Sequence, residues 1–203
     1  MRVYFPATLA MLMELADGGE FRPISGTGFA VTPALRESYA SGDDEELAEA
    51  AIREAARASL RLLAVEAPDS DADTEPDADT GLDAAPQTDA VADPDAPPPP
   101  ATPGDITRLP PRRAVVAADV ASATLHPELD DAVVRITGTV PLSAIASVLV
   151  DGADAEDKVR VAMVAIDAAD LGDQDAELAV GDIEDHDLGW YATQELPFLL
   201  ELL

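Results

Sequence analysis

The segment SGTGFAVTPALRESY, at residues 25–39, is the first place where residue types and spacing could support chemistry. Two glycines around a threonine, followed by a helix start, are typical of loops that cradle phosphate groups. A Walker loop also needs a lysine, and a dinucleotide-binding fingerprint needs a third glycine. The GTG that begins at Gly26 is followed by neither a lysine nor a third glycine at the required position. The next residues fit helix capping, with Thr32 as N-cap and Pro33 in the first helical position. We therefore predict a turn that leads into a capped helix, with an anion-binding helix start as the minor alternative.

A second candidate for chemistry is the acidic stretch DIEDHDLGW near the end of the chain. Asp182, Glu184 and His186 occupy alternating positions, and on an extended strand their side chains would point to one side, where they could bind a divalent ion. Three ligands from one short segment make a weak site, and acidic stretches are common in a chain of this composition. We predict solvated side chains and no metal ion or cofactor, with this triad as the alternative metal site.

No residue is predicted to be catalytic. Ser25 lacks the G-x-S-x-G context of a nucleophile elbow, and His126, the other histidine, precedes a proline in a predicted loop.

Three arginines form the most distinctive charge pattern. Arg53, Arg57 and Arg61 are spaced four residues apart and form a cationic ridge on one side of a predicted helix. The favoured interpretation is a solvated face on which Glu49 pairs with Arg53, because charged helix faces are usually solvated. The alternative is a docking site for an anion, such as the acidic segment of the same chain.

The helix that carries this ridge is the clearest element in the sequence, and we place it at 43–64. Asp43 and Glu46 form an acidic capping box, and alanines and leucines continue for several turns. The predicted buried stripe consists of Leu47, Ala51, Ala55 and Leu62, widened by Ile52, Leu60 and Leu63.

Shorter elements precede this helix. We predict a strand at 2–5 that ends before Pro6, and a helix at 9–16 that Thr8 caps and the glycines at 18–19 end.

Several strands and two helices are predicted in the second half. The strands are 114–120, 132–140 and one through Trp190, and 142–150 is interpreted as a strand although its spacing also fits a helix. The helices are 154–166 and a terminal one with Pro197 near its first turn.

The composition narrows the possible partners. The chain of 203 residues has 12 basic and 41 acidic residues and a net charge of −29, which argues against binding to nucleic acids or to anionic membranes. It has no cysteine, which fits a reducing compartment. The opening apolar run contains Pro6, Thr8 and Glu14 and does not fit a signal peptide, so we expect a cytoplasmic protein.

The segment 67–105 divides the chain. It contains 11 acidic residues, no basic residue and nine prolines, so we predict that it is disordered. Neither 1–66 nor 106–203 is expected to build a sufficient core alone. The predicted fold is therefore a single α+β domain built from both, with a mixed or antiparallel sheet, helices packed on one side, and the acidic, proline-rich segment as an insertion.

Four stretches together resemble a known family: the opening MRVYFPATLAMLMELADGGEF, the run from SGTGF to RLLA, the later RRAVVAADV and the closing WYATQEL. They are similar to an uncharacterised family of actinobacterial proteins, a domain of unknown function, and the resemblance covers both halves. It implies no activity and no catalytic residue.

These patterns favour an interaction or regulatory protein that binds a protein partner, and leave its oligomeric state open. The alternative is an enzyme or small-ligand binder with a pocket near the Gly26 turn and the Trp190 strand; nothing positive indicates an enzyme. A pocket in which arginine, histidine and carboxylates converge would favour this alternative, whereas a flat apolar patch would favour the partner.

Overall fold

Two segments far apart in the sequence form the centre of the sheet. The computed structural model describes residues 1–39, 41–67 and 109–203. In it, β1 (Arg2–Ala7) pairs antiparallel with β4 (Ala114–Asp119) along its whole length, from Arg2 opposite Asp119 to Ala7 opposite Ala114. The parts of the chain before and after the acidic segment therefore share one sheet. The prediction that 67–105 is disordered falls almost wholly outside the described residues.

The main sheet has seven strands in the order β5-β6-β3-β1-β4-β8-β9, and every pairing in it is antiparallel. A separate pair joins β2 to β7. The remaining strands are β2 (Glu20–Phe21), β3 (Thr27–Phe29), β5 (Thr124–Leu125), β6 (Val133–Arg135), β7 (Val140–Pro141), β8 (Ile145–Val150) and β9 (Gly189–Ala192).

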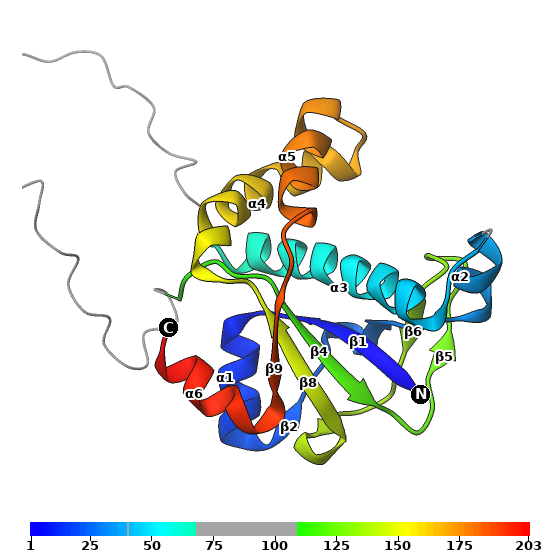
Figure 1. Ribbon diagram of the computed structural model, residues 1–203, viewed down its shortest axis with the longest axis vertical. Helices are drawn as coiled ribbons and strands as arrows, with labels where there is room; N and C mark the ends of the chain where they lie inside the picture. The colour runs from blue at the N-terminus through cyan, green and yellow to red at the C-terminus, as the bar shows by residue number, and fades with distance from the viewer. Residues whose placement is uncertain (40, 68–108) are drawn as a thin grey trace, which may run out of the picture.

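Helices cover both faces of this sheet (Figure 1). The α-helices are α1 (Leu9–Gly18), α2 (Pro33–Ser38), α3 (Asp44–Glu66), α4 (Glu156–Asp170), α5 (Gln174–Glu184) and α6 (Leu196–Glu201). Short 3-10 helices are η1 (Ile24–Gly26), η3 (Leu142–Ala144), η4 (Ala153–Ala155) and η5 (Thr193–Glu195).

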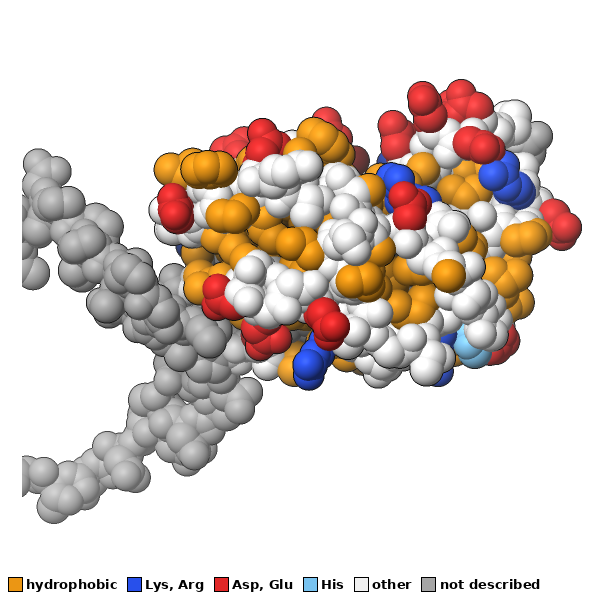
Figure 2. Space-filling view, turned by 90° about the horizontal axis from the view of Figure 1, so that it is seen from below, with side chains coloured by type: hydrophobic (Ala, Val, Ile, Leu, Met, Phe, Trp, Pro, Cys, Tyr) orange, Lys and Arg blue, Asp and Glu red, His pale blue; other side chains and the backbone are white. Residues whose placement is uncertain are grey.

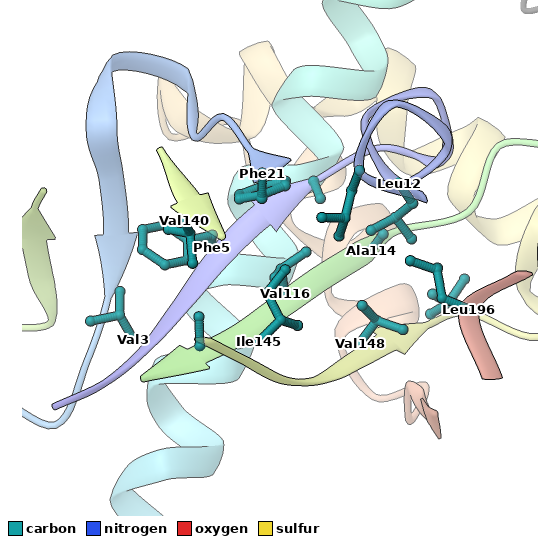
Figure 3. Close-up of a cluster of buried hydrophobic side chains, with 14 of the residues drawn as sticks. Val3, Phe5, Leu12, Phe21, Ala114, Val116, Val140, Ile145, Val148 and Leu196 are labelled. Carbon is teal, nitrogen blue, oxygen red and sulfur yellow. The ribbon is translucent and has the colours of Figure 1, made fainter. Parts of the chain in front are cut away.

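The alternation of side chains along β1 shows how each face is buried. Val3 and Phe5 point into a core that includes residues of α1 and α6 (Figure 3), whereas Tyr4 packs into a second core with α3. The single α+β domain with an antiparallel sheet is confirmed, but the prediction that helices pack on one side is wrong. Because β1 and β4 are apolar at nearly every position, both faces of the central strands need cover.

A third apolar cluster lies on the far side of α3 from the sheet. Leu60 and Leu63 of α3 pack there against Val159 and Ile166 of α4 and against Ile183 of α5. Helices α4 and α5 therefore form a further layer over α3, as Figure 1 shows. The predicted helix 154–166 corresponds to α4, which begins at Glu156, whereas α5 was not predicted.

The predicted helix caps are confirmed. The Thr8 and Thr32 hydroxyls accept hydrogen bonds from the amides of Met11 and Leu35, at 3.4 Å and 3.1 Å. The capping box at the start of α3 is present, and Gly19 ends α1 in the left-handed conformation.

Two predicted strand boundaries are wrong. Strand β1 continues through Pro6, which lies opposite Val115 of β4. On its other edge β1 pairs with β3 only at Tyr4, so the missing N–H of Pro6 removes no hydrogen bond between β1 and β3. The predicted strand 132–140 is two strands, because Gly138 turns the chain with φ +86° and sends β7 to pair with β2. The prediction of a strand within 142–150 is confirmed from Ile145 onward.

The face formed by α1, α6 and β2 shows hydrophobic side chains over much of its area, with acidic side chains toward its margins (Figure 2). Among the described residues, no helix is long and apolar enough to cross a lipid bilayer.

Candidate functional site

Two arginines of the cationic ridge bind carboxylates of α4 and α5. Arg57 donates to Glu184 at 2.8 Å, Glu177 at 3.1 Å and Asp170 at 3.3 Å. Arg61 binds Asp170 through two hydrogen bonds of 2.6 and 2.7 Å. The interpretation of a solvated ridge is therefore wrong for Arg57, whose side chain is only 16% exposed. Docking of the acidic segment on the ridge concerns residues that lie outside the described part of the chain.

These contacts shift the pKa values of Arg57 and Asp170. Burial lowers the pKa of Arg57, but its hydrogen bonds to Glu184, Glu177 and Asp170 outweigh burial and raise that pKa above its ordinary value. The hydrogen bond from Arg61 holds the pKa of Asp170 below its ordinary value. Arg57 thus connects both α4 and α5 to α3, and Arg61 adds a second link from α3 to α4.

Arg53, the third arginine of the ridge, has a different environment. It is exposed and has no carboxylate within ion-pair distance among the described residues. Its side chain lines a cavity of about 400 Å³, which we call the polar cavity. The other lining residues are Glu49, Ile52, Ala56, Arg113, Leu149, Glu184, His186, Asp187 and Leu188.

Three parts of the fold form the polar cavity. One wall is a single side of α3, because Glu49, Ile52, Arg53 and Ala56 are spaced three and four residues apart. The opposite wall is the end of α5 and the link to β9. Leu149 of β8 and Arg113, just before β4, complete the lining from the sheet.

A buried ion pair fixes the link between α5 and β9. Arg113 donates to both carboxylate oxygens of Asp151 at 2.9 Å, and the same guanidinium donates to the carbonyl oxygen of His186 at 2.8 Å. The two side chains are 2% and 0% exposed. The backbone amide of Arg113 also donates to Asp151, at 2.8 Å, so every charged group of the pair is satisfied.

The proposed metal triad is not assembled. Asp182 and Glu184 lie in α5, where a separation of two residues places side chains on nearly opposite sides, so the extended strand that the hypothesis assumed is absent there. Glu184 binds Arg57, and His186 Nε2 lies 3.5 Å from Asp154 Oδ2. No group of three or more possible metal ligands occurs among residues 1–39, 41–67 and 109–203.

The Gly26 turn and the Trp190 strand, near which a pocket was predicted, do not lie beside each other. Gly26 directly precedes β3, and β1, β4 and β8 separate β3 from the β9 strand that contains Trp190. The turn itself is confirmed: Gly26 has φ +68°, and its carbonyl accepts a 2.9 Å hydrogen bond from the Ile136 amide. The last residue in the sequence that lines the polar cavity is Leu188, two residues before Trp190.

A smaller cavity of about 200 Å³ lies on the other side of Arg53. Glu54 lines it with Asp130 and Asp131. Burial, together with the negative charges of Asp130 and Glu184, raises the pKa of Glu54 above its ordinary value. This cavity therefore has a strongly acidic lining, unlike the polar cavity.

Arg53, Glu184 and His186 stand out in the sequence, but in two patterns that are unrelated there. Arg113 and Asp151 do not stand out, although they lie just before β4 and just after β8, at the ends of adjacent strands. A charged residue next to each of two apolar strands was the available signal.

Comparison with known proteins identifies the family. The sequence model of a family of unknown function (DUF6912) matches residues 1–200, so the chain belongs to that family. No curated protein and no solved structure matches the chain.

Proposed function

We propose that the protein binds a small zwitterionic ligand in the polar cavity. In this proposal Arg53 binds the anionic group of the ligand, and Glu49 and Asp187 bind its cationic group. The volume of about 400 Å³ is within the range of cavities that hold small molecules.

The observation that carries this proposal is the contrast between Arg53 and the other arginines of the ridge. Arg57 and Arg61 are engaged by carboxylates of α4 and α5, whereas Arg53 lines the cavity with no such partner among the described residues. A planar guanidinium can bind a carboxylate or phosphate through two parallel hydrogen bonds. Arg53 is therefore the group best suited to bind an anion.

The other charges of the cavity favour a zwitterion over a simple anion. Arg113 is neutralised by Asp151, and Glu184 by Arg57. Glu49 and Asp187 also line the cavity and have no cation within ion-pair distance in the described part of the chain. These two carboxylates would repel a ligand that carries only negative charge, but they would attract an ammonium group.

The rigidity of the walls supports binding with little reorganisation. Arg57 holds the end of α5 against α3, and Arg113 holds the His186 backbone in place. Walls that are fixed before binding lose less conformational entropy when the ligand arrives, so the ordering cost is confined to the exposed side chains of Arg53, Glu49 and Asp187.

Calorimetric titration with matched compounds tests this proposal. The panel contains amino acids and dipeptides with free ammonium and carboxylate groups, together with their N-acetyl and C-amide derivatives. We expect binding only where both charges are present. Arg53→Gln should weaken it by about ten- to a hundredfold, because charged hydrogen bonds contribute about 1.5–3 kcal/mol.

Arg160→Gln is the matched control, because Arg160 is an exposed arginine on α4 that does not line the polar cavity. It should leave the affinity unchanged. The proposal fails if N-acetyl derivatives bind as tightly as their parent compounds or if the Arg53→Gln variant binds with unchanged affinity. It also fails if no zwitterion in the panel binds at a concentration of about 10 mM, which is well above the dissociation constants of ordinary ligands.

A further inference from the structure

Helix α4 has a second apolar side that nothing in the described structure covers. Val161, Val164 and Ala168 of α4 and its C-cap residue, Leu171, are separated by three, four and three residues, which places them along one side of the helix. Val164 and Leu171 are 87% and 90% exposed, Val161 is 59% exposed, and Ala168 is also exposed. We call these four residues the α4 stripe.

The α4 stripe is not part of the core-facing side of the helix. That side consists of Val159, Ala162, Ile166 and Ala169, all of which are buried against α3 and α5. Exposed apolar residues that occur singly are ordinary, but this spacing is the one by which two helices pack along a shared seam. The stripe therefore has the form of a helix-packing surface.

Acidic side chains surround the end of the stripe near Leu171. Asp167, Asp173 and Asp175 lie within four residues of Leu171, are exposed, and have no ion-pair partner among the described residues. Other acidic residues of α4 and α5 are already engaged: Asp170, Glu177 and Glu184 bind arginines of α3. Asp173 caps α5 by accepting a 2.9 Å hydrogen bond from the Ala176 amide, but no cation in the described part of the chain neutralises it. The three carboxylates therefore leave a negative rim that a partner with positive charges would neutralise.

We propose that the α4 stripe is a docking surface for a basic amphipathic helix of a protein partner. Apolar side chains of that helix, at three- and four-residue spacing, would pack on Val164 and Leu171, and its lysines or arginines would face Asp167, Asp173 and Asp175. The net charge of −29 would also accelerate encounter with a basic partner.

Charge favours a basic helix over two other segments that could cover the α4 stripe, namely the acidic segment 67–105 and a second copy of the chain. The segment 67–105 has 11 acidic residues and no basic one, and it would add negative charge to a negative rim. A second copy of the chain would bring a net charge of −29 against an equal net charge. Like charges that meet at an interface oppose association, so neither occupant fits as well as a basic helix.

The absence of cysteine from the sequence allows a direct test on the full chain. Val164→Cys introduces a single thiol in the stripe, and Leu129→Cys introduces one at a position that is also exposed, in the turn after β5. The probe is a synthetic leucine–lysine peptide of about 18 residues, long enough to form a helix, with leucines at three- and four-residue spacing. A peptide of the same composition in scrambled order is its control.

The rate of thiol modification by a disulfide reagent is measured at about 0.15 M salt, where exposed charges are largely screened beyond about 8 Å. We expect the thiol from Val164→Cys to react freely in the protein alone and to be protected at least tenfold by saturating amphipathic peptide, about 1.4 kcal/mol. The scrambled peptide should give no protection, and the thiol from Leu129→Cys should react at the same rate throughout.

In the chain without cysteine, replacement of Val161, Val164 and Leu171 by serine should weaken peptide binding at least about tenfold, since a few central apolar residues dominate such interfaces. Several outcomes would overturn the proposal: equal protection by the scrambled peptide, unchanged binding by the triple variant, or a Val164→Cys thiol that is already protected in the protein alone. Sedimentation as a dimer that the triple variant abolishes would assign the stripe to a second copy.

Discussion

The guanidinium of Arg113 and the carboxylate of Asp151 form a buried ion pair with hydrogen bonds of 2.9 Å, and the exposed pair of Arg2 and Asp119 has the same distances. Both arginines are bidentate and both pairs connect the ends of strands. Because the geometry is equal, the difference in burial decides how much each pair contributes to stability.

Arg113→Met should therefore destabilise the protein by about 3–5 kcal/mol, the usual cost of leaving one buried charge without its partner. Arg2→Met is the matched control and should cost no more than about 1 kcal/mol, because its side chain is 45% exposed and its pair is solvated. Urea unfolding of the two variants gives the comparison. Equal losses would mean that burial does not determine the contribution of this pair.

Arg57 should matter more than Arg61 for the attachment of α5. Arg57→Gln leaves Glu177 and Glu184 without their cation and should cost about 1.5–3 kcal/mol, whereas Arg61→Gln affects a more exposed pair and should cost about 1 kcal/mol or less. Hydrogen exchange at the amides of α5 provides the measurement. If exchange there accelerates equally in both variants, Arg57 is not the main link between α3 and α5.

Glu54→Gln should stabilise the protein at neutral pH. The pKa of Glu54 is raised in the folded state, so folding favours its neutral form. The contribution of Glu54 to stability is therefore complete below its unfolded-state pKa, and it is lost as pH rises through its folded-state pKa. The glutamine variant avoids this loss. Thermal unfolding at about pH 7 and at about pH 3, where the carboxyl group is protonated in either state, is the test. A stabilisation that persists unchanged at the lower pH would have another cause.

Replacing each of two glycines that have left-handed backbones by alanine would distinguish the free-energy cost of the backbone conformation from the cost of a steric clash. Gly26 and Gly138 have φ values of +68° and +86°, but a Cβ on Gly26 would clash with the carbonyl oxygen of Ile136, whereas one on Gly138 would meet nothing within 4 Å. Gly138→Ala should cost about 1–2 kcal/mol, from the backbone conformation alone. Gly26→Ala should cost clearly more, because backbone must also move. Chemical unfolding that gives equal values would show that the turn relaxes freely.

Local signals predicted most of the helices of this fold. The Asp43 capping box, the Thr32 N-cap and the glycine after α1 act within one turn of the chain, so their effects follow from neighbouring residues. Helix α5 was missed because its buried residues, Val180 and Ile183, are few, and because the alternating acidic residues at its end were considered as an extended strand.

The candidate site could be predicted less well, because its residues converge through long-range contacts. The ridge arginines were evident from helical spacing, but their partners lie more than 100 residues later in the sequence. The strand expected at 132–140 has good alternation throughout, yet Gly138 divides it between two sheets, and only tertiary pairing with β2 decides that outcome.

The position of β1 in the middle of the sheet has a consequence for synthesis on the ribosome. Arg2 pairs with Asp119, 117 residues later, so β1 leaves the ribosome well before the strand that completes its pairing. At about 5–20 residues per second, the interval lasts roughly 6–23 seconds. Throughout that time the edge of β1 that pairs with β4 lacks its native neighbour. The nascent chain is therefore a candidate client for chaperones that hold exposed hydrophobic segments until translation has passed β4.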